Sequence, residues 1–110
     1  MSAQLACRVG DLEPEQALRV ELDGAQGRVE VAVVRDAEGV FHAISDICSH
    51  GAVSLSAGEV DGCEIECYLH GSTFDLRTGA PTCLPATRPV PVYPVTVDGE
   101  LVLVDVDVTA

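Results

Sequence analysis

We expect an all-β fold from this sequence: an antiparallel sandwich or barrel that carries a loop-rich insertion in its middle. Three observations support this expectation. Apolar and polar residues alternate with the two-residue period of strands along most of the chain, a helical period is nearly absent, and residues 46–78 are rich in glycine and small polar side chains. The 110 residues suffice for one domain, and they contain no internal repeat.

Three apolar runs predict the strands of the N-terminal part. Residues 18–22 and 29–33 place valine or leucine at every second position, as is typical of half-buried strands. Residues 36–39, with the sequence Asp-Ala-Glu-Gly, have the composition of a turn and precede a third run at 40–44. The one helical turn that we expect lies around Leu12 to Gln16.

Two alternating runs near the C-terminus predict a hairpin. Residues 92–97 and 101–106 flank Asp98-Gly99, and a two-residue Asp-Gly joint between alternating runs is the strongest local hairpin signal. Five of the six prolines fall between Pro81 and Pro94, where they would stiffen the connection that leads back to this hairpin.

The middle of the chain has a different composition from its two ends. From about Asp46 to Thr78 its apolar runs are too short for anything but brief strands. We therefore expect one domain, in which residues 1–45 and 79–110 form the base and residues 46–78 form the inserted subdomain.

The charge balance excludes several classes of partner. Six arginines, no lysine and eighteen acidic residues give a formal net charge of −12, which repels nucleic acid and anionic membranes. The sequence shows neither a signal-peptide pattern nor the roughly twenty apolar residues of a membrane span, so we expect a cytoplasmic protein. In that reducing compartment an odd count of five cysteines favours metal binding over a disulfide framework.

Two clusters in the middle segment combine cysteine with histidine. The first, C-S-H, runs from Cys48 to His50, and the second, C-Y-L-H, runs from Cys67 to His70, with sixteen residues between them. Two thiolates and two imidazoles can form a four-ligand metal site. Zinc fingers usually group cysteine with cysteine, whereas one of each per loop suits a [2Fe-2S] cluster with thiolates on one iron and imidazoles on the other. A zinc-binding interaction module stays open as an alternative.

The pattern C-x-H, sixteen residues, C-x-x-H, followed by G-S-T-F-D-L-R-T-G and a proline-containing loop, resembles the Rieske iron-sulfur family. Within that family it is similar to the small soluble ferredoxins that feed electrons to aromatic-ring-hydroxylating dioxygenases, and the resemblance covers nearly the whole chain. It implies the Rieske fold and one Rieske-type [2Fe-2S] cluster, with Cys48 and Cys67 on the buried iron and His50 and His70 on the outer iron. The family's proline loop corresponds to residues 79–85.

Two departures from the high-potential members bear on the redox potential. Those members carry a disulfide between the cluster loops, and Val53 and Leu69 occupy the matching positions here. They also use a serine hydroxyl and a tyrosine hydroxyl as hydrogen-bond donors to cluster sulfurs. Ser72 keeps the serine donor, whereas Phe74 occupies the position of the tyrosine and has no hydroxyl. Since such donors stabilise the reduced cluster, we expect a potential at the low end of the Rieske range of roughly −150 to +300 mV.

The remaining cysteines and one histidine lie outside the ligand pattern. We expect Cys7, Cys63 and Cys83 to be ordinary thiols. His42, between Phe41 and Ala43 on a strand, is expected to be a surface or hydrogen-bonded core residue.

The resemblance implies a one-electron carrier and not an enzyme in its own right. A flavin-containing reductase would reduce it, and a terminal Rieske oxygenase would accept the electron. The acidic residues Glu59, Asp61, Glu64 and Glu66 would either steer these partners or form a plain solvated surface. Two other functions remain open: a small subunit of a nitrite reductase, and a ferredoxin of iron-sulfur cluster assembly.

Overall fold

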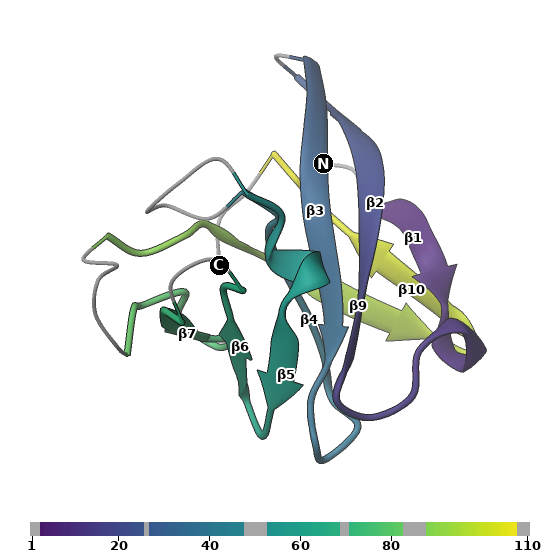
Figure 1. Cartoon of the computed structure of the whole chain (residues 1–110). Helices are drawn as coiled ribbons and strands as arrows, with labels where there is room; N and C mark the ends of the chain where they lie inside the picture. The colour runs from purple at the N-terminus through teal and green to yellow at the C-terminus, as the bar shows by residue number, and fades with distance from the viewer. Residues whose placement is uncertain (1–2, 26, 48–52, 69–70, 83–87, 108–110) are drawn as a thin grey trace.

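The computed structural model describes residues 3–25, 27–47, 53–68, 71–82 and 88–107. Within these ranges the chain forms ten strands, arranged in three antiparallel sheets, and two short 3₁₀ turns (Figure 1). The strands are β1 (Gln4–Arg8), β2 (Gln16–Gly24), β3 (Gly27–Arg35), β4 (Phe41–Ser45), β5 (Glu59–Asp61), β6 (Glu64–Glu66), β7 (Thr73–Asp75), β8 (Val92–Tyr93), β9 (Val95–Asp98) and β10 (Leu101–Val104). The 3₁₀ turns are η1 (Val9–Asp11) and η2 (Leu55–Ala57). No helix of the described ranges is long and apolar enough to cross a membrane.

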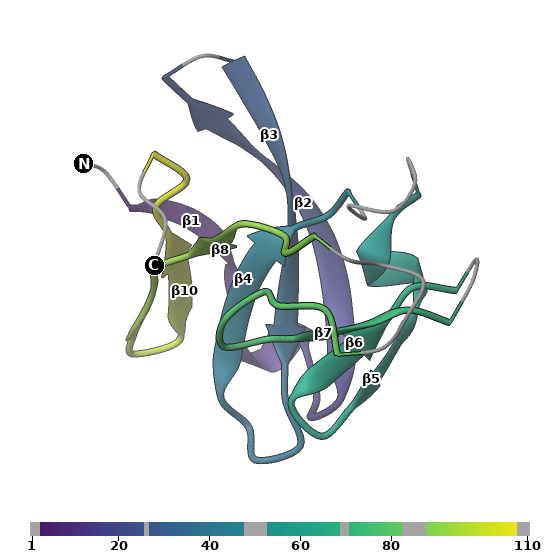
Figure 2. The ribbon, with the colours of Figure 1, turned by 90° about the vertical axis from the view of Figure 1, so that its left-hand side faces the viewer.

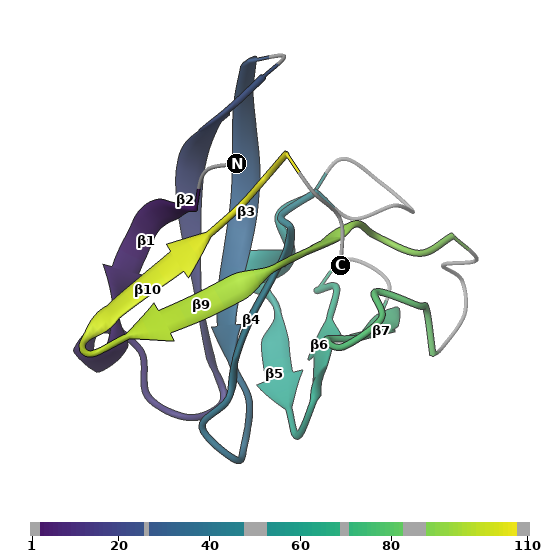
Figure 3. The same ribbon diagram turned by 180° about the vertical axis from the view of Figure 1, so that it is seen from behind.

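The central sheet has the order β2-β3-β4-β8 and lies between the other two sheets (Figure 2). On one side lies the β1-β10-β9 sheet, which Figure 3 shows in front of the central strands when the molecule is seen from behind. On the other side lies the β5-β6-β7 sheet, which is built entirely from the segment between residues 46 and 78. The division of the chain into a base and an inserted subdomain remains a prediction.

Strand β3 contributes to two separate hydrophobic cores, because successive side chains of a strand point to opposite faces. Val31 and Val33 face the first core, and Ala32 and Val34 face the second; all four are completely buried. The first core, shared with the β1-β10-β9 sheet, also contains Cys7, Leu12, Leu22, Phe41, Ala43, Tyr93, Val102 and Val104. The second core, shared with the β5-β6-β7 sheet, also contains Ile44, Leu55, Ile65, Cys67, Phe74, Leu76, Val90 and Val92. Each fully buried aliphatic side chain stabilises the fold by about 1.5–3 kcal/mol.

The strand predictions for the N-terminal part are confirmed, and the helix prediction is wrong. The runs at 18–22 and 29–33 lie within β2 and β3, and the run at 40–44 forms β4, which begins one residue later than the run. The helical turn expected around Leu12 to Gln16 does not form, because Gln16 already pairs with Arg35 at the start of β2. The single 3₁₀ turn of this region lies earlier, at Val9–Asp11.

The C-terminal hairpin is confirmed, with two differences in detail. Asp98 pairs with Leu101, so the turn contains Gly99 and Glu100, one residue later than expected. Gly99 has a φ of 63°, which a glycine adopts without strain. The run at 92–97 is divided at Pro94, which has no N–H to donate, so β8 joins the central sheet and β9 joins the other.

Candidate functional site

Two of the five residues predicted for the site lie in the described part of the chain. Cys67 and Ser72 are both buried. Cys48, His50 and His70 lie outside the described residues, as does the part of the predicted proline loop from Cys83 to Pro85. The structure therefore shows the bases of the predicted ligand loops, and each base can be built from its residues upward.

The second ligand loop is the connection between β6 and β7. Cys67 donates its backbone N–H to the carbonyl of Ser72 (2.6 Å) and accepts a hydrogen bond from the N–H of Gly71 (3.0 Å). Gly71 has a φ of 76°, in the left-handed region that favours glycine. Cys67 and Ser72 thus lie opposite one another, where the connection leaves β6 and enters β7.

The side chains at this base differ in exposure. Cys67 is 1% exposed and packs in the second core with Ile65 and Phe74, whereas the neighbouring Tyr68 is 58% exposed. Ser72 is completely buried beside β7. The base of this loop therefore contains a buried thiol, that of Cys67, and a buried hydroxyl, that of Ser72.

The first ligand loop has an equally defined base at the end of β4. Ile47 and Ser54 form an isolated antiparallel bridge, and the N–H of Leu55 donates to the carbonyl of Asp46 at 2.6 Å. Leu55 begins η2 and is completely buried in the second core. Ile47 and Ser54, which lie on either side of Cys48 and His50 in the sequence, are therefore neighbours in the fold.

Asp46 stabilises this base with a buried carboxylate. Its side chain is 0% exposed, yet it accepts hydrogen bonds from the Ser54 hydroxyl and from the N–H of Ser56 (2.8 Å). The Nε of Arg19 lies 3.5 Å from the Asp46 carboxylate. These contacts fix the end of β4 to η2. Removing one partner of a buried charge is costly, because the other partner is left unpaired in the interior. No motif in the sequence indicated this role.

Replacing Asp46 by alanine is expected to lower the free energy of unfolding by about 3–5 kcal/mol, because it removes a buried acceptor from three partners. Asp23→Ala is the matched control, since the Asp23 side chain is 84% exposed and its pairing with Arg28 is solvated. Urea denaturation followed by circular dichroism measures both values. Equal effects of the two substitutions would contradict the role assigned to Asp46.

The proline loop is anchored on both of its described sides. Thr82 donates its N–H to the carbonyl of Thr73 (2.7 Å), and the two threonine hydroxyls lie 2.5 Å apart. After the loop, the N–H of Val90 donates to the carbonyl of Gly79 (2.9 Å). Strand β7 thus carries the base of this loop as well as the base of the Cys67 loop.

The bases of all three loops are linked through the second core. Leu55, Cys67, Phe74 and Val90 each lie next to or within one base, and all four belong to this core. A further close contact joins η2 to β6: a Cβ built on Gly58 would lie 1.6 Å from the carbonyl oxygen of Glu66. The buried thiol, the buried hydroxyl and the apolar support fit a metal-sulfur group held between loops.

Two residues outside the ligand pattern lie close together. The Nε2 of His42 lies 2.8 Å from Oδ2 of Asp36, which confirms the expectation of a hydrogen-bonded histidine. The Sγ of Cys63 lies 3.7 Å from the same Nε2. Sequence reasoning treated Cys63 and His42 separately, because 21 residues separate them along the chain.

The environment of Asp36 alters its acidity. Burial by itself raises the pKa of this carboxyl, but hydrogen bonds from His42 and from the N–H groups of Val40 and Glu38 outweigh burial and lower the pKa below its ordinary value. Stability that depends on the ionised carboxylate is therefore present above the ordinary pKa and is lost as the pH falls through the lowered value.

Comparisons with known proteins match this arrangement over nearly the whole chain. The model of the Rieske [2Fe-2S] domain matches residues 2–94. The 3-phenylpropionate/cinnamic acid dioxygenase ferredoxin subunit of Escherichia coli K12 is 40% identical over 106 residues, which are 96% of this chain and 94% of that protein.

Solved structures agree with the sequence comparisons. The ferredoxin of carbazole 1,9a-dioxygenase from Nocardioides aromaticivorans IC177 has a TM-score of 0.85 and 40% identity, over 94% of this chain and 97% of that one. A chain in the complex of reduced oxygenase and oxidized ferredoxin of carbazole 1,9a-dioxygenase has a TM-score of 0.82 and 38% identity, over 92% of this chain and 99% of that one. These likenesses confirm the predicted fold class.

Proposed function

The chain belongs to the Rieske [2Fe-2S] domain family, and from this membership we propose that it is a one-electron carrier, the ferredoxin of a ring-hydroxylating dioxygenase system. A flavin-containing reductase reduces it, and a terminal oxygenase accepts the electron. The observation that carries the proposal is the 40% identity, over 96% of the chain, to a dioxygenase ferredoxin subunit. This likeness favours the carrier over a nitrite reductase small subunit or a cluster-assembly ferredoxin.

The cluster ligands in this proposal are Cys48, Cys67, His50 and His70. Bound to them, the [2Fe-2S] cluster takes up and releases one electron. Cys67 contributes its thiolate from the second core, where it is shielded from water, and the buried Ser72 supplies a hydroxyl donor beside it. All four ligands come from the chain itself, so no position is left for a substrate, as expected of a carrier.

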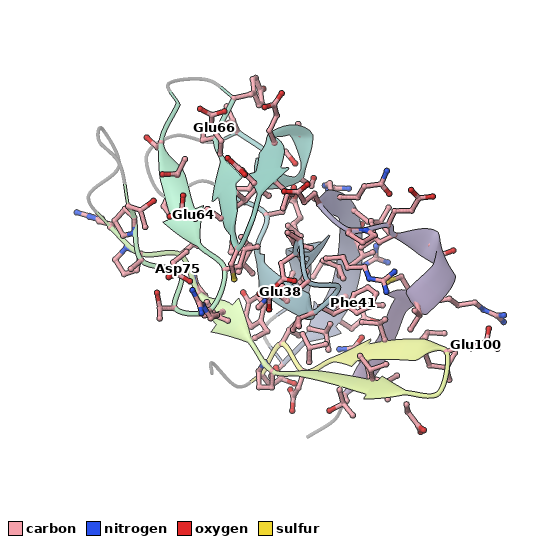
Figure 4. The ribbon with its side chains drawn as sticks, turned by 90° about the horizontal axis from the view of Figure 1, so that it is seen from below. Glu38, Phe41, Glu64, Glu66, Asp75 and Glu100 are labelled. Carbon is pink, nitrogen blue, oxygen red and sulfur yellow. The ribbon has the colours of Figure 1, made fainter. Side chains whose placement is uncertain are left out.

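The β5-β6 hairpin presents an acidic face that suits a basic partner. Glu59 lies opposite Glu66, and Asp61 lies opposite Glu64, so like charges stand side by side on one face of the hairpin. Figure 4 shows Glu64, Glu66 and Asp75 on the side of the molecule away from Glu100. Like charges directly opposite each other destabilise a sheet, and a partner with basic side chains relieves the repulsion.

The proposed function is tested with anaerobically purified protein. We expect two irons and two acid-labile sulfides per chain, and an electron paramagnetic resonance signal after one-electron reduction. Catalytic amounts of the protein should then support turnover of the cognate oxygenase with the cognate reductase, at a rate that falls with ionic strength. Colourless protein without sulfide, or turnover of a nitrite reductase in place of an oxygenase, would overturn the proposal.

Replacing Phe74 by tyrosine is expected to raise the midpoint potential by about 20–65 mV, the one-electron equivalent of a hydrogen bond of about 0.5–1.5 kcal/mol. Phe74 is completely buried, two residues after Ser72, and belongs to the same core as Cys67, so a hydroxyl on its ring would lie in that core. Phe41→Tyr, in the first core, is the control. Spectroelectrochemical titration measures all three potentials, and an unchanged value for Phe74→Tyr would refute this tuning.

We also place the carrier in the cytoplasm. The odd number of cysteines supports this placement, as do the free thiols of Cys7 and Cys63 among the described residues. Cell fractionation tests it, and recovery of the protein in a periplasmic or extracellular fraction would contradict it.

A further inference from the structure

Three side chains with metal-binding atoms meet away from the predicted cluster ligands. Asp36 lies just after β3, His42 lies on β4, and Cys63 lies in the turn between β5 and β6. One ligand atom from each of them, a carboxylate oxygen, an imidazole nitrogen and a sulfur, falls within 4.8 Å of the other two. Asp36 is buried, and His42 and Cys63 are half-buried.

These three residues line a cavity of about 360 Å³. Its wall also contains Glu38 and Arg77. The guanidinium of Arg77 lies 3.6 Å from the carboxylate of Asp75, which offsets its positive charge. The cavity thus combines a thiol, an imidazole and carboxylates with space for a small ion and its water.

The backbone holds the three side chains in place. Oδ1 of Asp36 accepts the N–H groups of Glu38 (2.9 Å) and Val40 (3.0 Å), which leaves Oδ2 directed at His42. The N–H of Ala37 donates to the carbonyl of Gly62 (3.0 Å), so the turn after β3 is tied to the turn that carries Cys63. Ligands oriented in this way lose little freedom when they bind an ion.

The geometry excludes a nucleophilic triad. In a Cys-His-Asp triad the thiol and the carboxylate contact different nitrogens of the imidazole ring. Here Oδ2 of Asp36 and Sγ of Cys63 both approach the same nitrogen, Nε2 of His42, at 2.8 and 3.7 Å. Three potential ligand atoms that converge on one point suit a shared ion, whereas the acid-base relay of a triad needs both ring nitrogens.

We propose that Asp36, His42 and Cys63 form a second metal site, which binds one zinc ion with a water molecule from the cavity as the fourth ligand. Bonds of about 2.0–2.3 Å in a tetrahedron separate the ligand atoms by about 3.3–3.6 Å. The spacing of 3.7 Å between sulfur and nitrogen is already close to this range, and the oxygen and nitrogen at 2.8 Å need to separate by about 0.5 Å. On binding, the thiol of Cys63 loses its proton to solvent and the sulfur becomes a thiolate ligand. The ring of His42 changes tautomer at the same time: the proton that Nε2 donates to Asp36 moves to Nδ1, which frees Nε2 to bind the ion.

Such an ion joins two parts of the fold. Asp36 and His42 belong to the central β3-β4 hairpin, whereas Cys63 belongs to the sheet that carries Cys67. Zinc at this position therefore acts as a structural link beneath the electron-carrying half of the protein, and we expect it to raise the melting temperature.

The test uses the protein with its iron-sulfur cluster intact. After dialysis against zinc and then against zinc-free buffer, we expect one zinc per chain in addition to two irons, measured by mass spectrometry of the metals. Cys63→Ser should weaken zinc binding by at least about tenfold. Even the loss of a residue that only orients a metal ligand lowers the metal affinity by about 10- to 100-fold, and Cys63 is a proposed ligand itself. Cys7→Ser is the matched control, because Cys7 lies in the first core.

The outcomes separate this site from the cluster. Zinc uptake that raises the melting temperature of the wild type and of Cys7→Ser, but not of Cys63→Ser, supports the proposal. No retained zinc, equal retention by Cys63→Ser, or uptake accompanied by loss of iron would overturn it, the last because zinc would then occupy the cluster ligands.

Discussion

Replacing Gly58 by alanine is expected to destabilise the fold by at least about 3 kcal/mol and to cost the protein most of its iron. The added Cβ would lie 1.6 Å from the carbonyl oxygen of Glu66, 2.9 Å from its carbonyl carbon and 3.3 Å from the carbonyl oxygen of Leu55. These are backbone atoms, so no side-chain rotation relieves the clash. Either η2 or β6 must move, and Glu66 directly precedes Cys67.

The expected destabilisation comes from the close approach of Gly58 to the backbone of Glu66, and not from the backbone conformation of Gly58. Its φ of −87° and ψ of −170° are open to any residue. Gly10→Ala is the control, because a Cβ at Gly10 meets no atom within 4 Å. We expect that substitution to change stability by less than about 0.5 kcal/mol.

Thermal unfolding and iron content measure both variants. If Gly58→Ala kept the melting temperature and the iron content of the wild type, η2 and β6 could separate without cost. The proposed effect of Gly58 on the loop that contains Cys67 would then be wrong.

Replacing Cys67 by alanine is expected to abolish the visible colour and the acid-labile sulfide entirely, and replacing it by serine is expected to abolish most of both. Cys67 is the proposed ligand whose surroundings are described: it lies directly after β6, opposite Ser72, and is 1% exposed in the second core. The alanine variant matters because a serine oxygen can still bind iron weakly. Both variants should keep the first core, so circular dichroism should still report β-structure.

Cys7 provides a matched comparison for Cys67. It is 7% exposed in the first core, where burial, with a smaller effect from the Asp11 charge, raises the pKa of its thiol. It belongs to the core that contains none of the described bases of the ligand loops. Cys7→Ser should retain two irons per chain, and full iron content in Cys67→Ala would contradict the assignment of the ligand.

The central and C-terminal strands could be predicted because their signals are local. The alternation at 18–22 and 29–33 defines which residues face a core, and the Asp-Gly pair at 98–99 defines a turn. The helical turn around Leu12 to Gln16 was wrong, because a single turn is too short for periodicity to outweigh the pairing of β2 with β3.

The ligand pattern was also visible in the sequence, whereas its supports were not. Asp46 stabilises the first loop through Arg19, 27 positions earlier, and Asp36 and His42 meet Cys63 across two sheets. Such partners are brought together only by the tertiary fold. No alternation or spacing along the chain encodes them.

The division of strand β3 between two cores bears on how damage to one half of the protein reaches the other. Its Val31 and Val33 support a core that contains none of the described bases of the ligand loops, and its Ala32 and Val34 support the core that contains Cys67. A substitution that loosens the packing around Cys67 therefore leaves the side-chain contacts of the first core in place.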